Sequence, residues 1–422
     1  MFHVFLLFPL FRPSQRGYCF GRHVPALPST LKYADFRVLI VSSVLEGIGF
    51  RGQLVVVGWM LLEESGSPFI VGLGIGSFLA PNALVGIFGG AVTDRLDRRR
   101  VLRLTSLALS LNTLVLAAVT LHDIVIWQVI LLTVIGGGLR SVVQTARQSY
   151  AYDIVGAPEA LRALALLTLA LRIGGLGGAL ATGAALSLWG AGEAYLVLAL
   201  ALLLSGIVVY WARSKGQAAP VNTQPVFENL REYAGELRTN ATLAWLVLLT
   251  ACIEVFGFSH LSAFPVLIRD ELGGSGGDLG LASGASSAGG IVAVLLFSVR
   301  HEVRRQGVIF LTVTVLYGLT ILLLGVSQTL LMVMLAAALV SAIASLTDVL
   351  SQILVQRAVP NEMRGRAMGT WALAIGTAPL GHLQMGALIS AFGVSTALAI
   401  NGCALIASGI AAAVLVARIR RL

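Results

Sequence analysis

Long apolar runs alternate with short polar segments over most of this chain. An α-helix needs about 20 consecutive apolar residues to cross the hydrocarbon core of a bilayer, so each run predicts one membrane-spanning helix. The runs form two sets of six, and the expected fold is all-α with twelve transmembrane helices. The predicted spans are 37–62, 68–91, 101–121, 124–147, 162–187 and 191–212, then 241–267, 277–299, 307–325, 328–352, 366–390 and 394–416.

The polar segments divide the chain into five parts. Met1–Phe11 is apolar but covers only about half a bilayer span, and it lacks the charged start of a signal peptide. We therefore interpret the first part as a cytoplasmic extension. The parts are the N-terminal extension (1–35), a six-helix bundle (36–212), a cytoplasmic linker (213–240), a second six-helix bundle (241–416) and a basic cytoplasmic tail (417–422).

Composition supports a membrane protein and excludes most soluble classes. Charged residues make up 12% of the chain and hydrophobic residues 57%, whereas a soluble domain has about 25% charged residues. The net charge of +9 comes from short basic blocks beside apolar runs, so we expect no nucleic-acid partner. The cysteines and histidines lack metal-ligand spacing. We find no catalytic triad or phosphate loop, and we expect no enzyme activity, metal or cofactor.

The basic residues lie almost entirely on one side of the predicted membrane. With the N-terminus inside, 25 of the 29 lysines and arginines fall in cytoplasmic segments, and Arg147 is counted among them. Only Arg269 falls in an outside loop. Cytoplasmic loops of membrane proteins carry such an excess. The sequence thus predicts a multi-pass protein of the cell (inner) membrane, with lipid around it and both termini cytoplasmic. We take it as a monomer.

The two sets of spans resemble each other at an offset of 203–208 residues. Parallel six-helix repeats with a substrate site between them near the midplane are typical of secondary transporters. The matched segments, in the same order in both halves, are Glu46–Phe50 with Glu254–Phe258, Arg95–Arg100 with Arg300–Arg305, Arg140–Gln148 with Asp348–Gln356, Gly175–Gly177 with Pro379–Gly381, and Ser205–Ile207 with Ser408–Ile410.

The loop after the second span reads Gly90-Ala91-Val92-Thr93-Asp94-Arg95-Leu96-Asp97-Arg98-Arg99-Arg100. It resembles the signature loop of the major facilitator superfamily, with Asp97 where that family usually has glycine. The chain looks most like bacterial multidrug, siderophore and lysophospholipid permeases of the enterobactin-exporter type. This resemblance implies two pseudo-symmetric bundles that alternate access to a central cavity. It is also carried by Phe36-Arg37, Ala146-Arg147-Gln148, Arg172–Gly178 and Gln356–Arg366.

Six charged residues lie inside predicted spans, where charge is costly and each is a candidate for function by default. In the resembling family, five of them lie on helices that line the cavity. Polar side chains at helical spacing accompany them. A set of structural ion pairs between helices is the open alternative. The charges are Glu46, Arg51, Arg140, Arg172, Glu254 and Asp348, and the accompanying polar residues are Gln144, Gln352 and Ser345.

Glu46 and Glu254 are the candidates for proton coupling. A carboxyl group in a mostly apolar cavity has its charged form disfavoured, which suits it to bind and release a proton during transport. Arg51 or Arg140 nearby would oppose this effect, and the sequence leaves open which one prevails.

The signature loop is a candidate gate. In the family its aspartate and arginines hold helix 2 against helix 11, which implies that role for Gly90, Asp94, Arg95 and Arg98. Asp153 is a candidate partner for Arg95 or Arg98. The alternative is a simple positively charged anchor at the membrane surface.

A glycine cluster in the fifth span, Gly174, Gly177 and Gly178, resembles the glycine-proline motif of exporters, without its proline. We favour close helix packing as its role over substrate contact. His260 and His382 also lie in spans, and we interpret them as packing residues.

These features predict a secondary active transporter for a small molecule, with protons as the coupling ion. The favoured function is efflux of a small amphipathic drug or siderophore. The alternatives within transport are a lysophospholipid flippase and a metabolite importer. A non-transporting membrane sensor is the alternative from another class, but it would be expected to bring an extra soluble domain.

Overall fold

The computed structural model describes residues 29–93, 96–214, 216, 235–298, 305–360, 363–416 and 418–421. Every regular element within these ranges is helical, which confirms the predicted all-α fold. Eleven described helices are long and apolar enough to cross a membrane, with α2 as the twelfth of the arrangement. The N-terminal extension before residue 29, most of the linker, and Asp94 and Arg95 lie outside the described residues.

The helices follow the predicted spans closely. The fourth helix runs to Val155, eight residues beyond the predicted end, because its polar last turns pack inside the protein. The first set is α1 (Ala34–Ser65), α2 (Pro68–Thr93), α3 (Arg98–His122), α4 (Ile126–Val155), α5 (Ala157–Leu188) and α6 (Ala191–Val209). The second is α8 (Ala241–Cys252) with η3 (Ile253–Gly257), η4 (Phe258–Ser262), α9 (Ala263–Val266) and η5 (Leu267–Glu271), then α10 (Gly276–Ser298), α11 (Gln306–Gly325), α12 (Leu330–Arg357), α13 (Arg364–Ile375), α14 (Ala378–Phe392) and α15 (Val394–Leu415).

The start of α3 explains the residue that departs from the family signature. Asp97 precedes the helix, and its carboxylate accepts a hydrogen bond from the Arg99 backbone N–H at 2.9 Å. An aspartate in this position satisfies a backbone donor that the helix leaves free. Asp97 is therefore an N-cap, a role that a glycine side chain cannot supply.

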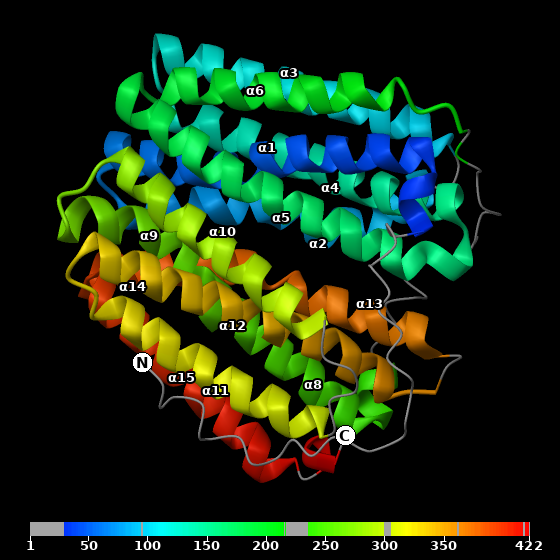
Figure 1. Ribbon diagram of the computed structural model, residues 1–422. Helices are drawn as coiled ribbons and strands as arrows, with labels where there is room; N and C mark the ends of the chain where they lie inside the picture. Colours follow the sequence, from blue (N-terminus) through cyan, green and yellow to red (C-terminus); the bar gives the residue numbers. More distant parts are fainter. Residues whose placement is uncertain are drawn as a thin grey trace, which may run out of the picture.

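The helices form two bundles of six, as Figure 1 shows with α1–α6 in one half and α8–α15 in the other. In the first bundle α1 packs on α5 and α6, and α4 packs on α2 and α3. In the second, α10 packs on α12 and α11 packs on α15. The two pseudo-symmetric bundles of the major facilitator fold are thus present.

The first spans of the two bundles differ, because one is a continuous α-helix and the other is interrupted. The first helix, α1, is a single α-helix of 32 residues, whereas the seventh span changes from α8 to the π-helical η3, the 3₁₀-helical η4 and the π-helical η5. Pro265 lies in this span. Proline lacks a backbone N–H, and its ring clashes with the carbonyl four residues earlier, so Pro265 accounts for the loss of α geometry in η4 just before it.

The bundles touch at one end of the molecule, which we call the distal end. It holds the short connections 65–68, 188–191 and 392–394. There α5 packs on α10 so closely that a Cβ on Gly280 would lie 2.6 Å from the Gly183 Cα, and α2 packs on α14. In the described chain α4 packs extensively only within its own bundle. Among the described residues, the close contacts between the bundles lie toward the distal end. We call the opposite end, where α3 begins and α4 ends, the linker end.

The outer surface suits a lipid environment. Large apolar side chains are exposed along most helices. Trp127 and Trp189 lie near distal helix ends, and Trp211 near the linker end, each more than 60% exposed. Tryptophan is enriched where membrane proteins cross the two bilayer interfaces. The chain is a multi-pass membrane protein.

Candidate functional site

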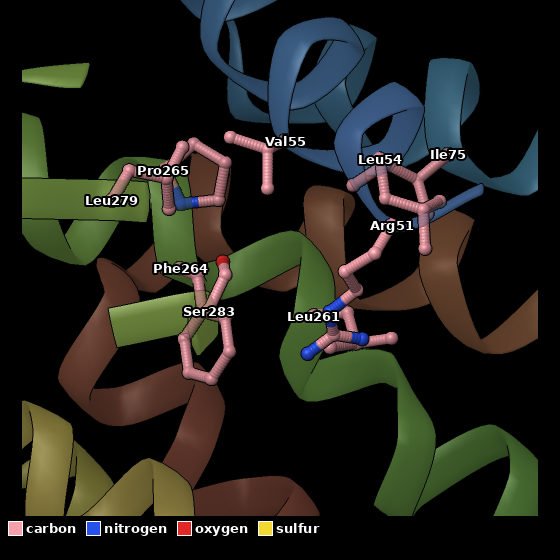
Figure 2. A pocket seen from close by; sticks show the side chains of 9 residues that line it. All are labelled: Arg51, Leu54, Val55, Ile75, Leu261, Phe264, Pro265, Leu279 and Ser283. Carbon is pink, nitrogen blue, oxygen red and sulfur yellow. The ribbon is translucent and has the colours of Figure 1, made fainter. Parts of the chain in front are cut away.

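Two arginines of the first bundle reach across to the second. The Arg51 guanidinium on α1 donates through Nη2 to the Ser286 hydroxyl of α10 at 3.0 Å. Arg172 on α5 donates through Nη1 to the Ser345 hydroxyl of α12 at 2.9 Å. Figure 2 shows Arg51 extending from α1 toward the segment that carries Leu261. The structure thus brings Arg51, Arg172 and Ser345 to the interface between the bundles.

An acid and an amide complete the polar face of α12. Asp348 lies one turn beyond Ser345 and accepts a hydrogen bond from the Gln352 side chain at 3.4 Å. Arg172 is near enough to Asp348 for electrostatic attraction. This charge pair spans the two bundles, so it depends on their relative position.

Glu254 lies in η3, where the seventh span leaves α geometry. Its side chain is buried, and no described residue lies within ion-pair distance of its carboxylate. Its near charged neighbour is Asp348, which also bears a carboxylate. A Cβ on Gly381 of α14 would lie 3.0 Å from the Glu254 carbonyl oxygen, so the eleventh span packs directly on this turn.

The structure places Glu46 away from this interface. Its carboxylate forms an ion pair with Arg147 of α4, and both side chains are about 2% exposed. Arg147 also donates to the Ser42 hydroxyl at 3.4 Å, and Ser42 bonds Ser205 of α6 at 2.9 Å. Glu46 thus lies inside the first bundle and does not line the space between bundles. For this residue the structure shows the ion-pair alternative.

Arg147 corrects the loop count from the sequence. It was assigned to a cytoplasmic segment, but α4 continues past it and buries it. The available signal was its spacing, because Arg140, Gln144 and Arg147 fall on one helical stripe. A residue on the stripe of an intramembrane arginine belongs with the interior of the bundle, where Glu46 compensates its charge.

Arg140 has a different environment from Arg147. Its Nη1 donates to the Gln144 side-chain amide oxygen Oε1 at 3.3 Å. Its guanidinium carbon lies 3.5 Å from the centre of the Phe50 ring, which stacks on Phe78 of α2 with ring centres 6.0 Å apart. An arginine over an aromatic face is held by the electrostatics of the ring. Arg140 and Gln144 therefore form a local cluster with two phenylalanines.

A small pocket lies between the bundles on the distal side of Arg51. Figure 2 shows Val55 and Pro265 facing each other from the two bundles across it. Its lining is mostly apolar, with Ser283 as the other polar side chain besides Arg51. The pocket sits where the bundles are in contact, and it is too small to hold a siderophore-sized molecule in this arrangement.

Both intramembrane histidines are buried in the second bundle. The His260 Nδ1 lies 2.7 Å from the Gly257 carbonyl oxygen, and the His382 Nδ1 lies 2.7 Å from the Ser262 hydroxyl. Each pairing links segments around the irregular seventh span, so packing remains the interpretation for both. No group of three or more potential metal ligands occurs among the described residues.

At the linker end, Arg98 forms an ion pair with Asp153 at 2.6 Å, one of the two pairings considered from the sequence. It joins the start of α3 to the last turn of α4. Gly90 belongs to the last part of α2, and Asp94 and Arg95 lie outside the described residues. The gating role of this loop therefore stays a prediction.

The glycine cluster of α5 divides into two kinds. Side chains at Gly174 and Gly178 would overlap the backbone of α1 at Val44 and Ile48. A side chain at Gly177 would meet no atom within 4 Å. Two of the three glycines thus allow the close approach of α1 and α5, and Gly177 points away from it.

Comparison with known proteins agrees with this architecture. The family model described as transmembrane secretion effector matches residues 27–421. The Staphyloferrin A transporter of Staphylococcus aureus (strain NCTC 8325 / PS 47) is 23% identical over 336 residues, covering 78% of this chain and 84% of that protein.

Solved structures share the fold. A POT family transporter in complex with 5-aminolevulinic acid has a TM-score of 0.75 at 11% identity, covering 92% of this chain and 97% of that one. A bacterial homolog of the human lysosomal transporter Spinster, in an inward-facing and occupied conformation, has a TM-score of 0.66 at 16% identity, covering 90% and 94%. This chain is a major facilitator-type secondary transporter, not an enzyme, and belongs to the transmembrane secretion effector family.

Proposed function

We propose that this transporter exports a small amphipathic molecule, a drug or a siderophore, in exchange for protons. The observation that carries the proposal is the buried Glu254 carboxyl, which lacks an ion-pair partner among the described residues and sits at the irregular turn of the seventh span. Burial disfavours the charged form of a carboxyl. Exposure of Glu254 to one side of the membrane and then the other can therefore drive proton uptake and release.

The basic loops orient the molecule in the membrane. They lie at the linker end, which becomes the cytoplasmic end under the positive-inside rule. The close contacts between the bundles lie at the distal end among the described residues, so in the proposed cycle this arrangement admits substrate from the cytoplasmic end. The family description, secretion effector, and the siderophore named for the Staphylococcus aureus relative support export of such a molecule.

The cycle we propose moves the bundles 36–212 and 241–416 as two bodies about the cavity. Opening the distal end breaks the Arg51–Ser286 hydrogen bond and the bond from the Arg269 guanidinium to the Leu62 carbonyl at 3.0 Å. Both bonds join the two bundles. The loss of these contacts is offset by closure at the linker end, where the signature loop is the proposed latch.

The test is Glu254→Gln in proteoliposomes with an imposed pH gradient, with Staphyloferrin A and Hoechst 33342 as probes. Glutamine keeps the size and polarity of the side chain but cannot exchange a proton. We expect gradient-driven movement of the accepted probe to be abolished and thermal stability to be unchanged. Glu64→Gln, at an exposed position near the end of α1, is the matched control.

Unchanged gradient-driven transport by Glu254→Gln would remove this residue from the coupling mechanism. Accumulation in the direction of the proton flow, instead of against it, would replace export with import. Movement of lysophospholipid alone, with neither probe transported, would favour the flippase alternative.

A further inference from the structure

Arg140 is a buried cation without an ion-pair partner among the described residues. Its side chain is 8% exposed, and no described carboxylate lies within ion-pair distance of it. Arg147, two turns away on the same helix, is paired with Glu46, and Arg172 is near Asp348. A buried charge without a counter-ion is costly. A fold that retains such a charge at mid-membrane calls for an external anion.

The cluster around Arg140 orients its free donors. Nη1 is engaged by Gln144, and the guanidinium is stacked on Phe50. The Nε donor is buried without a hydrogen-bond partner. Nε and the neighbouring Nη2 form one edge of the planar guanidinium, and this edge matches the two oxygens of a carboxylate. Gln144 is only partly buried.

The distribution of charge between the bundles supports an anionic ligand. Arg51 and Arg172 reach the second bundle from the first, and Arg51 follows Phe50, the residue on which Arg140 stacks, in α1. The acids Glu254 and Asp348 both belong to the second bundle. Among these residues the first bundle therefore supplies the positive charges at the interface and the second supplies the acids, and Arg140 packs on the stacked Phe50 and Phe78.

We propose that Arg140 binds a carboxylate of the transported molecule, which makes amphipathic carboxylates the substrate class. The carboxylate takes the Nε–Nη2 edge, the two phenylalanines pack on the apolar part of the molecule, and Arg51 adds a second positive charge. This inference rests on the proposed transport function, because it assigns a substrate class to the same cavity.

The test measures binding to the purified full-length protein in detergent micelles by isothermal titration calorimetry. The probes are 2-naphthylacetate and its neutral isostere 2-naphthylacetamide. We expect the wild type to bind the carboxylate at least about tenfold more tightly than the amide, as for a charge-assisted bidentate pair. Arg140→Ala should abolish this selectivity and leave amide binding unchanged, and Arg140→Lys should lose most of it because lysine lacks the fork.

Arg37→Ala is the matched control, since that arginine belongs to α1 of the same bundle and its side chain is exposed. It should keep the selectivity of the wild type. Equal affinity of the wild type for both probes, no binding of the carboxylate, or selectivity retained by Arg140→Ala would each overturn the inference. If Arg140→Ala does not fold, the binding of both naphthyl probes to Phe50→Leu is measured instead. Unchanged affinity of this variant for both probes would overturn the proposed site.

Measuring binding and transport separately distinguishes failure of this inference from failure of the proposed function. Arg140-dependent carboxylate selectivity without proton-driven movement would leave the inference standing and remove the function. Suppose instead that the wild type shows no carboxylate selectivity and that Arg140→Ala exports a neutral amphipathic molecule at the wild-type rate, driven by protons. The proposed function would then stand, and the inference about Arg140 would be removed.

Discussion

Glu46 and Glu254 occupy equivalent positions in the two repeats, yet the protein treats them differently. Glu46 is enclosed by the first bundle and paired with Arg147. Glu254 is also buried, but it has no described ion-pair partner and its near charged neighbour is another acid, Asp348. Equivalence in the sequence repeat thus does not mean equivalence in function. One copy supports the structure of its bundle, and the other is the candidate for proton exchange.

The backbone around Glu46 is regular, whereas the backbone around Glu254 is irregular. Glu46 lies in a continuous α-helix that packs on α5 through Gly174 and Gly178. Glu254 lies in a span that alternates between α, π and 3₁₀ geometry, against α14, which itself begins after a break at Gly376 and Thr377. Irregular turns inside membrane helices expose backbone groups and allow local rearrangement. We infer that the first bundle is the more rigid half and the second carries the moving parts.

The largest expected effect comes from breaking the internal ion pair of the first bundle. Arg147→Ala leaves the Glu46 carboxylate buried without its partner, which should lower the free energy of unfolding by about 3–5 kcal/mol. Equilibrium unfolding in detergent measures it. The double variant Glu46→Gln with Arg147→Met should recover most of the loss. If Arg147→Ala alone is as stable as the wild type, the ion pair of Glu46 does not stabilise the first bundle, and the contrast with Glu254 is lost.

A smaller effect is expected from the packing of α1 on α5. Gly174→Ala places a methyl group against the Val44 carbonyl and should cost about 1–3 kcal/mol in unfolding free energy, because the helices must separate. Gly177→Ala is the matched control, since its methyl group would meet no atom within 4 Å. Thermal unfolding of the two variants compares them. Equal stability would refute a tight first bundle.

The smallest change in stability is expected in the seventh span. Pro265→Ala restores a backbone N–H, so the span can become more regular, and the unfolding free energy should change by less than about 1 kcal/mol. The transport rate should nevertheless fall severalfold, because a straighter span resists rearrangement. Pro68→Ala, at the first position of α2, is the control, because proline there replaces no helical hydrogen bond. If Pro265→Ala transports at the same rate as the control, the irregular geometry of the seventh span is not needed for transport.

The sequence identified the charged residues inside the membrane spans, but it predicted their three-dimensional positions less well. The intramembrane charges were identified individually, and Arg51, Arg172 and Asp348 do lie at the interface between the bundles. The placement of Glu46 and Arg147 was wrong, since both are enclosed by the first bundle. The irregular seventh span also escaped notice, although Pro265 was a visible signal for it.

The number of spans, their positions, the repeat and the family could all be predicted from the sequence, because each depends on runs of residues along one chain. Which charges are paired depends on how the helices pack in three dimensions. A membrane helix is apolar on every side, so its hydrophobic pattern does not tell a face that packs on protein from a face that meets lipid. The rotation of each helix, and with it the different fates of Glu46 and Glu254, follows from close packing between helices.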